Sequence, residues 1–422
     1  MTETTTHPPI PRLPELAPEP PPAGDPAGRA ARTRTAIIDA TRALFLERGY
    51  AGTRISDITA ACGISRAGFY NYFKDKRDVF ILLGSAAFRE LLDVVARWDS
   101  LPTPATSADV IGWVRDYLAF MDRHGAFLHA FSWSAPEDDE FRSGARRMQM
   151  RVAFQLGLRL RARQPRPTSA PEALGLVVLA MLDRTWYGSR VTRLPVDDAD
   201  MVRTAAALIR CCLTAEPAAV AVGPDRARPA AGAAPQRPAD PVLDAARRLF
   251  VQRDVADVAV ADVVAACGVD RAEFAARFGS TKALFLATGS ASLQEVLDAI
   301  DGWDRLPRPC STDDVAGWVD AWFDTLDRHG VFVYLFALAV RPGTEFAAHG
   351  LSSLMKVAWA LGTRLRSRQA VPSVAPDALG LAVLGMVSDT WAHSRAERLP
   401  IGHADLVAVL AAALQDLLTT RE

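Results

Sequence analysis

The side chains best suited to specific chemistry lie in one short segment, residues 66–77. Arg66, Tyr70, Asn71 and Tyr72 fall on one face of a predicted helix, and two lysines and an arginine follow directly. Such guanidinium, phenol, amide and ammonium groups donate hydrogen bonds to phosphate oxygens and to base edges in a major groove. The pattern therefore predicts a surface that binds duplex DNA. The alternative is a solvated face on an unrelated helix pair.

The neighbouring residues predict the elements that would position this face. Residues 57–62 form a short helix, Gly63 makes a turn, and Ser65 caps the next helix. Phe69 and Phe73 stand four residues apart on that helix, on the side opposite the polar face. The segment is thus predicted to be a helix-turn-helix with a phenylalanine core.

A family resemblance is carried by Gly49-Tyr50, Thr53, Asp57-Ile58, Gly63-Ile64-Ser65-Arg66, Phe69-Tyr70, Phe73, Lys76 and Phe80. Residues 35–80 resemble the N-terminal domain of the TetR (tetracycline repressor) family. The resemblance implies a three-helix DNA-binding domain and a larger helical domain that holds an inducer pocket. It also implies a dimer interface formed by the last two helices of that domain, here residues 171–190 and 197–214.

The resemblance implies roles for single residues as well, with Tyr70 and Lys76 gripping phosphates. The full set expected at the DNA is Thr53, Arg54, Ser56, Ser65, Arg66, Ala67, Gly68, Tyr70, Asn71, Tyr72 and Lys76. Two departures matter. Gly68 stands where the family usually has threonine, which costs about 1 kcal/mol of helix stability relative to alanine. Asn71-Tyr72 replaces a histidine-containing pair, so the family gives no guide to the preferred DNA sequence.

The chain repeats itself at a spacing of 205 residues. Cys62-Gly63 returns as Cys267-Gly268, and the Asp-Arg-His-Gly run at 122–125 returns at 327–330. A repeat this long is a duplicated domain and not a solenoid unit. Because the resemblance implies a dimer, we expect the two halves to form an intramolecular pseudo-dimer. A dimer of chains remains the alternative.

The two copies of the helix-turn-helix differ in their polar residues. The counterparts of Gly68, Tyr70, Asn71, Tyr72 and Lys76 are Glu273, Ala275, Ala276, Arg277 and Thr281, whereas the core phenylalanines recur as Phe274, Phe278 and Phe285. Residues 29–80, here called the first head, hold ten basic and five acidic residues, a net charge of +5. Residues 240–285 hold six and seven, a net charge of −1. We expect that this second head no longer binds DNA, unless Glu273 accepts a hydrogen bond from a cytosine amine.

The predicted fold is all-α, with two tandem TetR-like units. The predicted order is a Pro-rich disordered tail (1–28), a first helix-turn-helix DNA-binding domain (29–80), a first helical regulatory domain (81–215), an Ala/Pro linker (216–240), a second, degenerate helix-turn-helix domain (241–285) and a second helical regulatory domain (286–422). Each Asp-Arg-His-Gly run is expected to end its helix, with glycine in a left-handed turn.

Composition excludes several classes of protein. No run approaches the ~20 apolar residues of a membrane span, the start lacks a signal-peptide pattern, and the five cysteines form no CxxC pair. We expect a cytoplasmic protein with reduced thiols and no membrane partner. No phosphate-binding glycine loop, metal-spaced cluster or nucleophile with a base is present, so we expect no enzyme activity, cofactor or metal.

Aromatic residues in the helical patterns are candidates for the core or for a ligand pocket between helices. They are Trp113, Tyr117, Phe127, Phe131, Trp133, Trp186, Trp318, Trp322 and Trp391. The expected function is a DNA-binding transcriptional regulator, a repressor released by a small hydrophobic effector, that binds double-stranded DNA mainly through the first head. The alternative is a DNA-inactive ligand sensor or protein-interaction module built from the same repeats.

Overall fold

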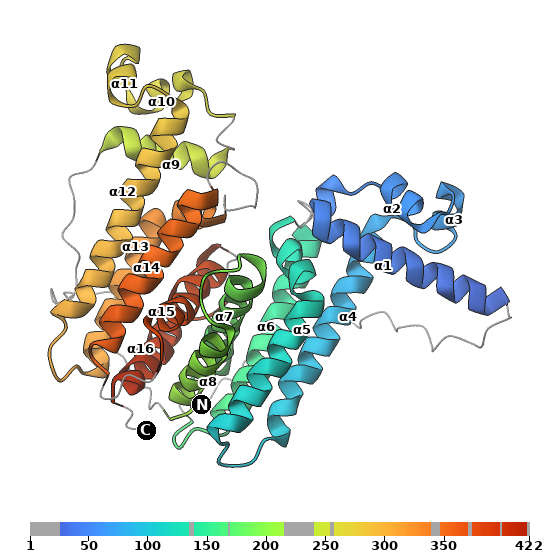
Figure 1. Cartoon of the computed structure of the whole chain (residues 1–422), viewed down its shortest axis with the longest axis horizontal. Coiled ribbons are helices and arrows are strands. Elements are labelled where there is room, and N and C mark those ends of the chain that lie inside the picture. The colour runs from blue at the N-terminus through green and yellow to red at the C-terminus, as the bar shows by residue number, and fades with distance from the viewer. Residues whose placement is uncertain are drawn as a thin grey trace, which may run out of the picture. The chain divides into compact units, whose positions relative to one another are not determined.

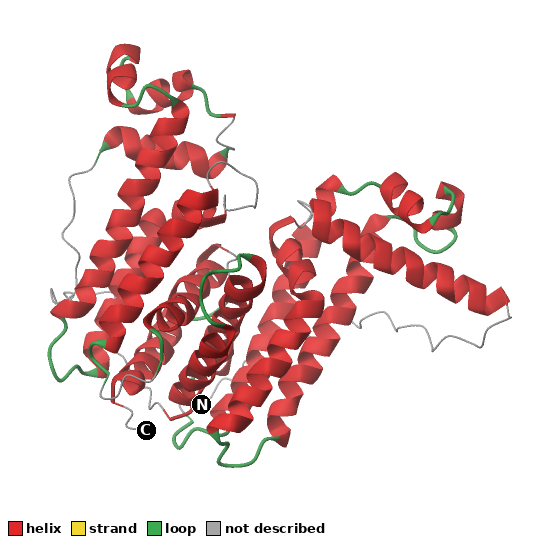
Figure 2. Ribbon diagram, in the orientation of Figure 1, coloured by secondary structure: helices red, strands yellow, loops and turns green. Residues whose placement is uncertain are grey.

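The computed structural model describes residues 26–134, 139–167, 169–214, 240–253, 257–338, 347–369, 374–396 and 399–419. Within these residues every element is a helix (Figure 2), in agreement with the predicted all-α class. Nearly all of the predicted tail and linker lie outside the described residues. No described helix combines the length and the apolar character that are needed to cross a bilayer.

The second half repeats the element order of the first. The first half contains α1 (Pro26–Gly52), α2 (Ile55–Cys62), α3 (Arg66–Tyr70), α4 (Lys76–Ala96), a 3-10 turn (Arg97–Ser100), α5 (Ser107–Ser134), α6 (Asp139–Arg161), α7 (Pro171–Trp186), a π-helical turn (Tyr187–Val191) and α8 (Asp198–Thr214). The second half contains α9 (Pro241–Gln252), α10 (Val260–Cys267), α11 (Arg271–Arg277), α12 (Thr281–Asp301), a 3-10 turn (Gly302–Arg305), α13 (Thr312–Leu338), α14 (Ala347–Arg366), α15 (Pro376–Leu384), two π-helical segments (Gly385–Asp389 and Ala392–Ala396) and α16 (His403–Thr419).

The chain divides into two compact units. One comprises the described residues of 1–93 and 123–145, and the other those of 94–122 and 146–422. The first head belongs to the former unit, and α7 to α16 belong to the latter (Figure 1). The predicted domain borders remain predictions.

The two heads bury the same positions. In the first head the core contains Ile37, Phe45, Ile58, Phe69 and Phe80. In the second head it contains the residues 205 positions later, which are Val242, Phe250, Val263, Phe274 and Phe285. The duplicated fold therefore rests on a duplicated core.

The prediction that the Asp-Arg-His-Gly runs end their helices is wrong. Both runs lie inside long helices, because α5 continues to Ser134 and α13 continues to Leu338. In α13 the glycine serves packing: a Cβ on Gly330 would lie 2.7 Å from the indole ring of Trp391. A small residue is required there by a side chain 61 positions away, and the glycine does not mark a helix end.

Close helix crossings recur in the two regulatory regions. A Cβ on Gly157 of α6 would lie 1.6 Å from the carbonyl oxygen of Pro171, at the start of α7. A Cβ on Gly362 of α14 would lie 1.6 Å from the carbonyl oxygen of Pro376, at the start of α15. These glycines let the helices approach backbone to backbone. Beyond them, α7 and α8 each pack against α15 and α16, shown in green and red in Figure 1.

Candidate nucleic-acid interface and ligand cavity

Helix α3 is fixed by a cap at one end and by buried phenylalanines along one side. The Ser65 hydroxyl accepts a hydrogen bond from the Gly68 backbone N–H at 3.0 Å, as predicted. Phe69 is fully buried and Phe73 nearly so. With this side in the core, the opposite side must face outward.

The outward side of α3 carries the predicted polar groups. Arg66, Ala67 and Asn71 are exposed, and Tyr70 is 50% exposed although its ring packs edge-on against Phe69. Tyr72 differs, because it is half-buried and packs against the core of the head. The structure therefore brings Arg66, Tyr70 and Asn71 to one accessible face.

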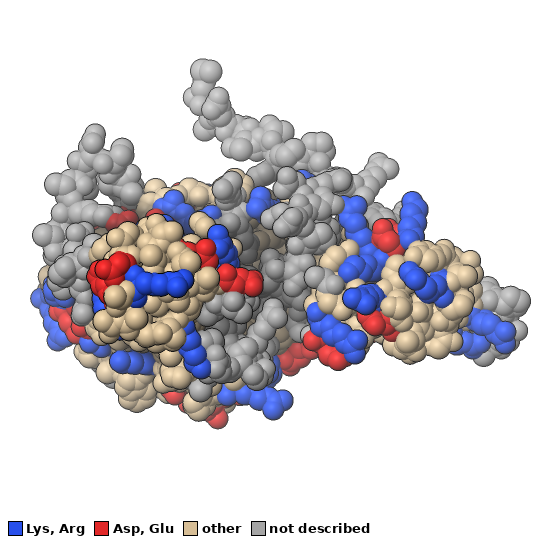
Figure 3. Space-filling model, turned by 90° about the horizontal axis from the view of Figure 1, so that it is seen from above, with Lys and Arg blue, Asp and Glu red and all other residues tan. Residues whose placement is uncertain are grey.

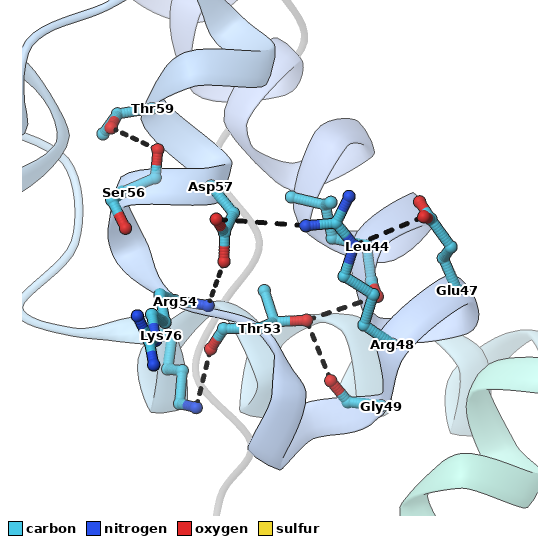
Figure 4. Close-up of polar contacts among 10 residues, drawn as sticks. All are labelled: Leu44, Glu47, Arg48, Gly49, Thr53, Arg54, Ser56, Asp57, Thr59 and Lys76. Carbon is cyan, nitrogen blue, oxygen red and sulfur yellow. Dashed lines mark hydrogen bonds and ion pairs between the residues drawn. The ribbon is translucent and has the colours of Figure 1, made fainter.

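Thr53, Arg54 and Ser56 were all expected at the DNA, but at the junction between α1 and α2 they differ in exposure (Figure 4). Arg54 and Ser56 are exposed at the start of α2. Thr53 is fully buried, and its single hydroxyl hydrogen is shared between the carbonyl oxygens of Gly49 at 2.8 Å and Leu44 at 3.2 Å. Its counterpart in the second head, Val258, is also buried. The position is a core position, and the Thr53 side chain offers no surface to DNA.

Lys76 also has a structural role. Its Nζ donates to the carbonyl oxygens of Tyr50 at 2.7 Å and Thr53 at 2.9 Å, and it lies 4.3 Å from the centre of the Tyr50 ring. Burial lowers the pKa of Lys76 from its ordinary value. Two of the three ammonium hydrogens are thus engaged within the head, which leaves one for a phosphate.

The second head has the same geometry without the same chemistry. Asp270 caps α11 by accepting from the Glu273 backbone N–H at 2.7 Å. Glu273, Ala275 and Ala276 are exposed on the outward side. Arg277 forms an ion pair with Asp240. Among the charged side chains that Figure 3 shows on the first head most are basic, whereas acidic and basic ones lie side by side on the second.

A cavity that is partly open to solvent lies among α12, α13, α14 and the end of α15. Its walls are mostly apolar, and Trp322 and Trp391 are among them, together with Arg184 of α7. The Trp322 indole N–H donates to Ser388 Oγ at 3.3 Å, and that of Trp391 to Asp327 at 2.7 Å. Two of the predicted pocket aromatics thus line one cavity in the second half.

The other predicted pocket aromatics have different surroundings. Trp113 and Trp318 are buried at equivalent positions, and their indole N–H groups donate to backbone carbonyls of Val94 and Ala299, both at 3.0 Å. The Tyr117 hydroxyl donates to Asp183 at 2.6 Å, and burial raises the pKa of Tyr117 well above its ordinary range. Trp186 is buried and donates to Asp122 at 3.0 Å. The side chains of Phe127, Phe131 and Trp133 lie outside the described residues.

Two parts of the chain match one protein family. Residues 37–83 and 242–288 each match the family described as bacterial regulatory proteins, tetR family. Over 78 residues the chain is 38% identical to the HTH-type transcriptional repressor BepR of Brucella suis biovar 1 (strain 1330), which covers 18% of this chain and 37% of that protein. Over 103 residues it is 30% identical to the HTH-type transcriptional repressor DhaR of Mycobacterium sp. (strain GP1), covering 24% and 50%.

A third relative is the HTH-type transcriptional repressor KstR2 of Rhodococcus jostii (strain RHA1), 40% identical over 60 residues, which covers 14% of this chain and 29% of that protein. The chain thus spans half or less of the length of these curated relatives. The two family matches fall on the two heads, one in each half. The chain therefore carries, twice in tandem, a domain that matches the tetR family of bacterial regulatory proteins.

Proposed function

We propose that this chain is a DNA-binding transcriptional repressor that reads duplex DNA through the outward side of α3. The contrast between the two heads carries this proposal. Both keep the same core and an exposed arginine, Arg66 or Arg271, yet the first exposes Tyr70 and Asn71 where the second has Ala275 and Ala276. Polar and aromatic groups kept in one copy and lost from the other serve a task that the fold alone does not need.

Each exposed group has a matching partner on DNA. A guanidinium such as that of Arg66 pairs with guanine O6 and N7, and an amide such as that of Asn71 pairs with adenine N6 and N7. The Tyr70 hydroxyl suits a phosphate oxygen. The net charge of +5 on residues 29–80 attracts the DNA backbone and makes the affinity depend on salt.

A matched pair of variants tests the reading head. Genomic fragments that bind the full chain are selected, and their affinity is measured by fluorescence anisotropy over a range of salt concentrations. Arg66→Ala should weaken specific binding by roughly 5- to 150-fold, the usual value of one base contact. Arg271→Ala, at the equivalent position of the second head, should change it less than twofold. If the full chain binds no fragment in a salt-dependent way, the chain is a DNA-inactive sensor.

The two halves form an intramolecular pseudo-dimer in this proposal. The mutual packing of α7 and α8 with α15 and α16 supports it, since these are the last helices of the two halves. A pseudo-dimer brings one competent head to DNA, so one chain should protect an asymmetric site. Two chains are needed for a symmetric operator, because each half-site needs its own reading helix. Footprinting together with light scattering of the protein–DNA complex distinguishes these arrangements.

An uncharged apolar effector would enter the cavity of the second half. The cavity's indole and aliphatic walls support this class of ligand, since its polar groups are the hydroxyls of Ser353 and Ser388 and the guanidinium of Arg184, which is paired with Asp389. Ser353→Phe should fill the cavity and abolish release from DNA by a panel of uncharged apolar compounds, with DNA affinity kept. Ser352→Phe places the same ring on the neighbouring exposed residue and should leave release intact. Equal behaviour of the two variants would place the effector elsewhere.

A further inference from the structure

Arg184 and Asp389 meet at the contact between the two halves. Arg184 Nε donates to Asp389 Oδ2 at 2.8 Å, and Arg184 Nη2 donates to Asp389 Oδ1. Only 14% of the arginine side chain and 10% of the aspartate side chain are exposed. This is a two-pronged, largely buried ion pair.

The two residues are separated by 205 positions, which is the spacing of the repeat. They therefore occupy the same position in the two halves. In a pairing related by a twofold axis, a residue that contacts its own equivalent must lie at the axis. The packing is reciprocal in the same sense, because α7 contacts α16 while α8 contacts α15. Arg184 and Asp389 thus mark the pseudo-twofold axis.

A second pair of equivalent positions lies one helical turn away. A Cβ on Gly385 would lie 2.7 Å from the Arg184 Cβ, 2.9 Å from the Met181 Cα and 3.1 Å from the carbonyl oxygen of Ala180. The counterpart of Gly385 is Ala180 itself, 205 positions earlier. The backbone of α7 therefore packs directly against Gly385, and an alanine at position 385 would clash with α7.

From these two asymmetries we propose that the interface is selective for unlike halves, and that its partner is the second half of the same chain. Two first halves would bring Arg184 against Arg184 and an alanine into the place of Gly385. Two second halves would bring Asp389 against Asp389. A largely buried like-charge pair is strongly unfavourable. The inference rests on the proposed pseudo-dimer and adds that the chain rejects symmetric association through this surface.

Charge reversal in the full chain tests the selectivity. Arg184→Asp and Asp389→Arg each place like charges at the axis, so each variant alone should show a lower thermal midpoint. The double variant Arg184→Asp/Asp389→Arg restores opposite charges and should recover most of that loss. Arg203→Asp, at an exposed residue of α8, changes the net charge as Arg184→Asp does but breaks only a surface ion pair with Asp200, so it should lower the midpoint far less. A double variant no more stable than either single variant would overturn the proposal.

Mixing the two single variants gives the sharper result. One variant carries aspartate on both halves and the other carries arginine on both, so opposite charges can meet only between chains. Light scattering should show a one-to-one complex with twice the 45.6 kDa mass of one chain. Neither variant alone, nor the natural chain, should form this complex.

Absence of the complex, with the natural chain still of single mass, would overturn the selectivity but leave the pseudo-dimer intact. A natural chain of double mass at every concentration would overturn the pseudo-dimer itself.

Discussion

Lys76 holds the end of α1 against the start of α4, since its ammonium group lies 2.7 Å from the carbonyl oxygen of Tyr50 and over the Tyr50 ring. The second head has threonine at the equivalent position. The contact is therefore particular to the head that is proposed to bind DNA, and it keeps the α1–α2 junction beside the reading helix in place.

Lys76→Met should destabilise the first head even without DNA. The variant removes two hydrogen bonds from a charged donor to backbone carbonyls and one cation–π contact, with an expected cost of about 1.5–3 kcal/mol. Urea unfolding and amide exchange at residues 50–53 measure the effect. Lys74→Met is the control, because Lys74 is exposed. If both variants are equally stable, Lys76 acts mainly on phosphate.

Thr53→Val should separate folding from DNA contact. The hydroxyl of Thr53 is buried and bonded within the head, and Val258 fills the same position in the second copy. We expect a loss of about 1 kcal/mol in the free energy of unfolding from the lost hydrogen bonds. DNA affinity should change less than twofold in anisotropy titrations. A tenfold loss of affinity would show that this residue reaches the DNA.

Two glycines of α13 should respond in opposite ways to alanine. A Cβ on Gly317 meets nothing within 4 Å, so Gly317→Ala should stabilise the helix by up to about 1 kcal/mol. A Cβ on Gly330 would meet the Trp391 ring at 2.7 Å, so Gly330→Ala should cost about 1–3 kcal/mol by overpacking. Thermal unfolding compares the two directly. A stabilising Gly330→Ala would mean that Trp391 moves freely into the cavity.

His329 should make stability depend on pH. Burial, and then the positive charges of Arg247 and Arg328, lower the pKa of His329 from 6.5 to about 4, against a smaller opposing effect of Asp244. The unfolded chain therefore binds a proton on this residue before the folded chain does. The free energy of unfolding should fall as the pH drops from about 6.5 to about 4. Urea unfolding across this range should show a flatter profile for His329→Gln, and an unchanged profile would contradict this assignment.

The head was predictable from sequence because its determinants are local. Ser65 caps the turn that follows it, and Phe69 and Phe73 are one helical turn apart, so their burial could be inferred from spacing. Because Phe69 and Phe73 occupy the buried side, the remaining polar residues of this helix could be assigned to its exposed side. Thr53 was expected at the DNA from the family resemblance alone, and local spacing gave no sign of its burial, because that burial depends on carbonyls in the preceding helix.

The regulatory regions were less predictable because their determinants are remote. Gly330 looked like a helix end, but it faces a tryptophan from another helix. Trp322 and Trp391 reach the cavity while Trp318 does not appear among its walls, although all three stand in similar helical patterns. The Arg184–Asp389 pair joins residues whose types alone give no sign of meeting.

The glycine–alanine contact at the axis also bears on how such a chain can change over time. In an assembly of identical chains, one substitution changes both sides of the axis at once. A residue on the axis then contacts an identical residue, so only residue types that can pack against themselves are possible there. Here Gly385 faces Ala180, so each side mutates independently. Fusion of the two copies thus opens axis positions to residue pairs that no homodimer can hold.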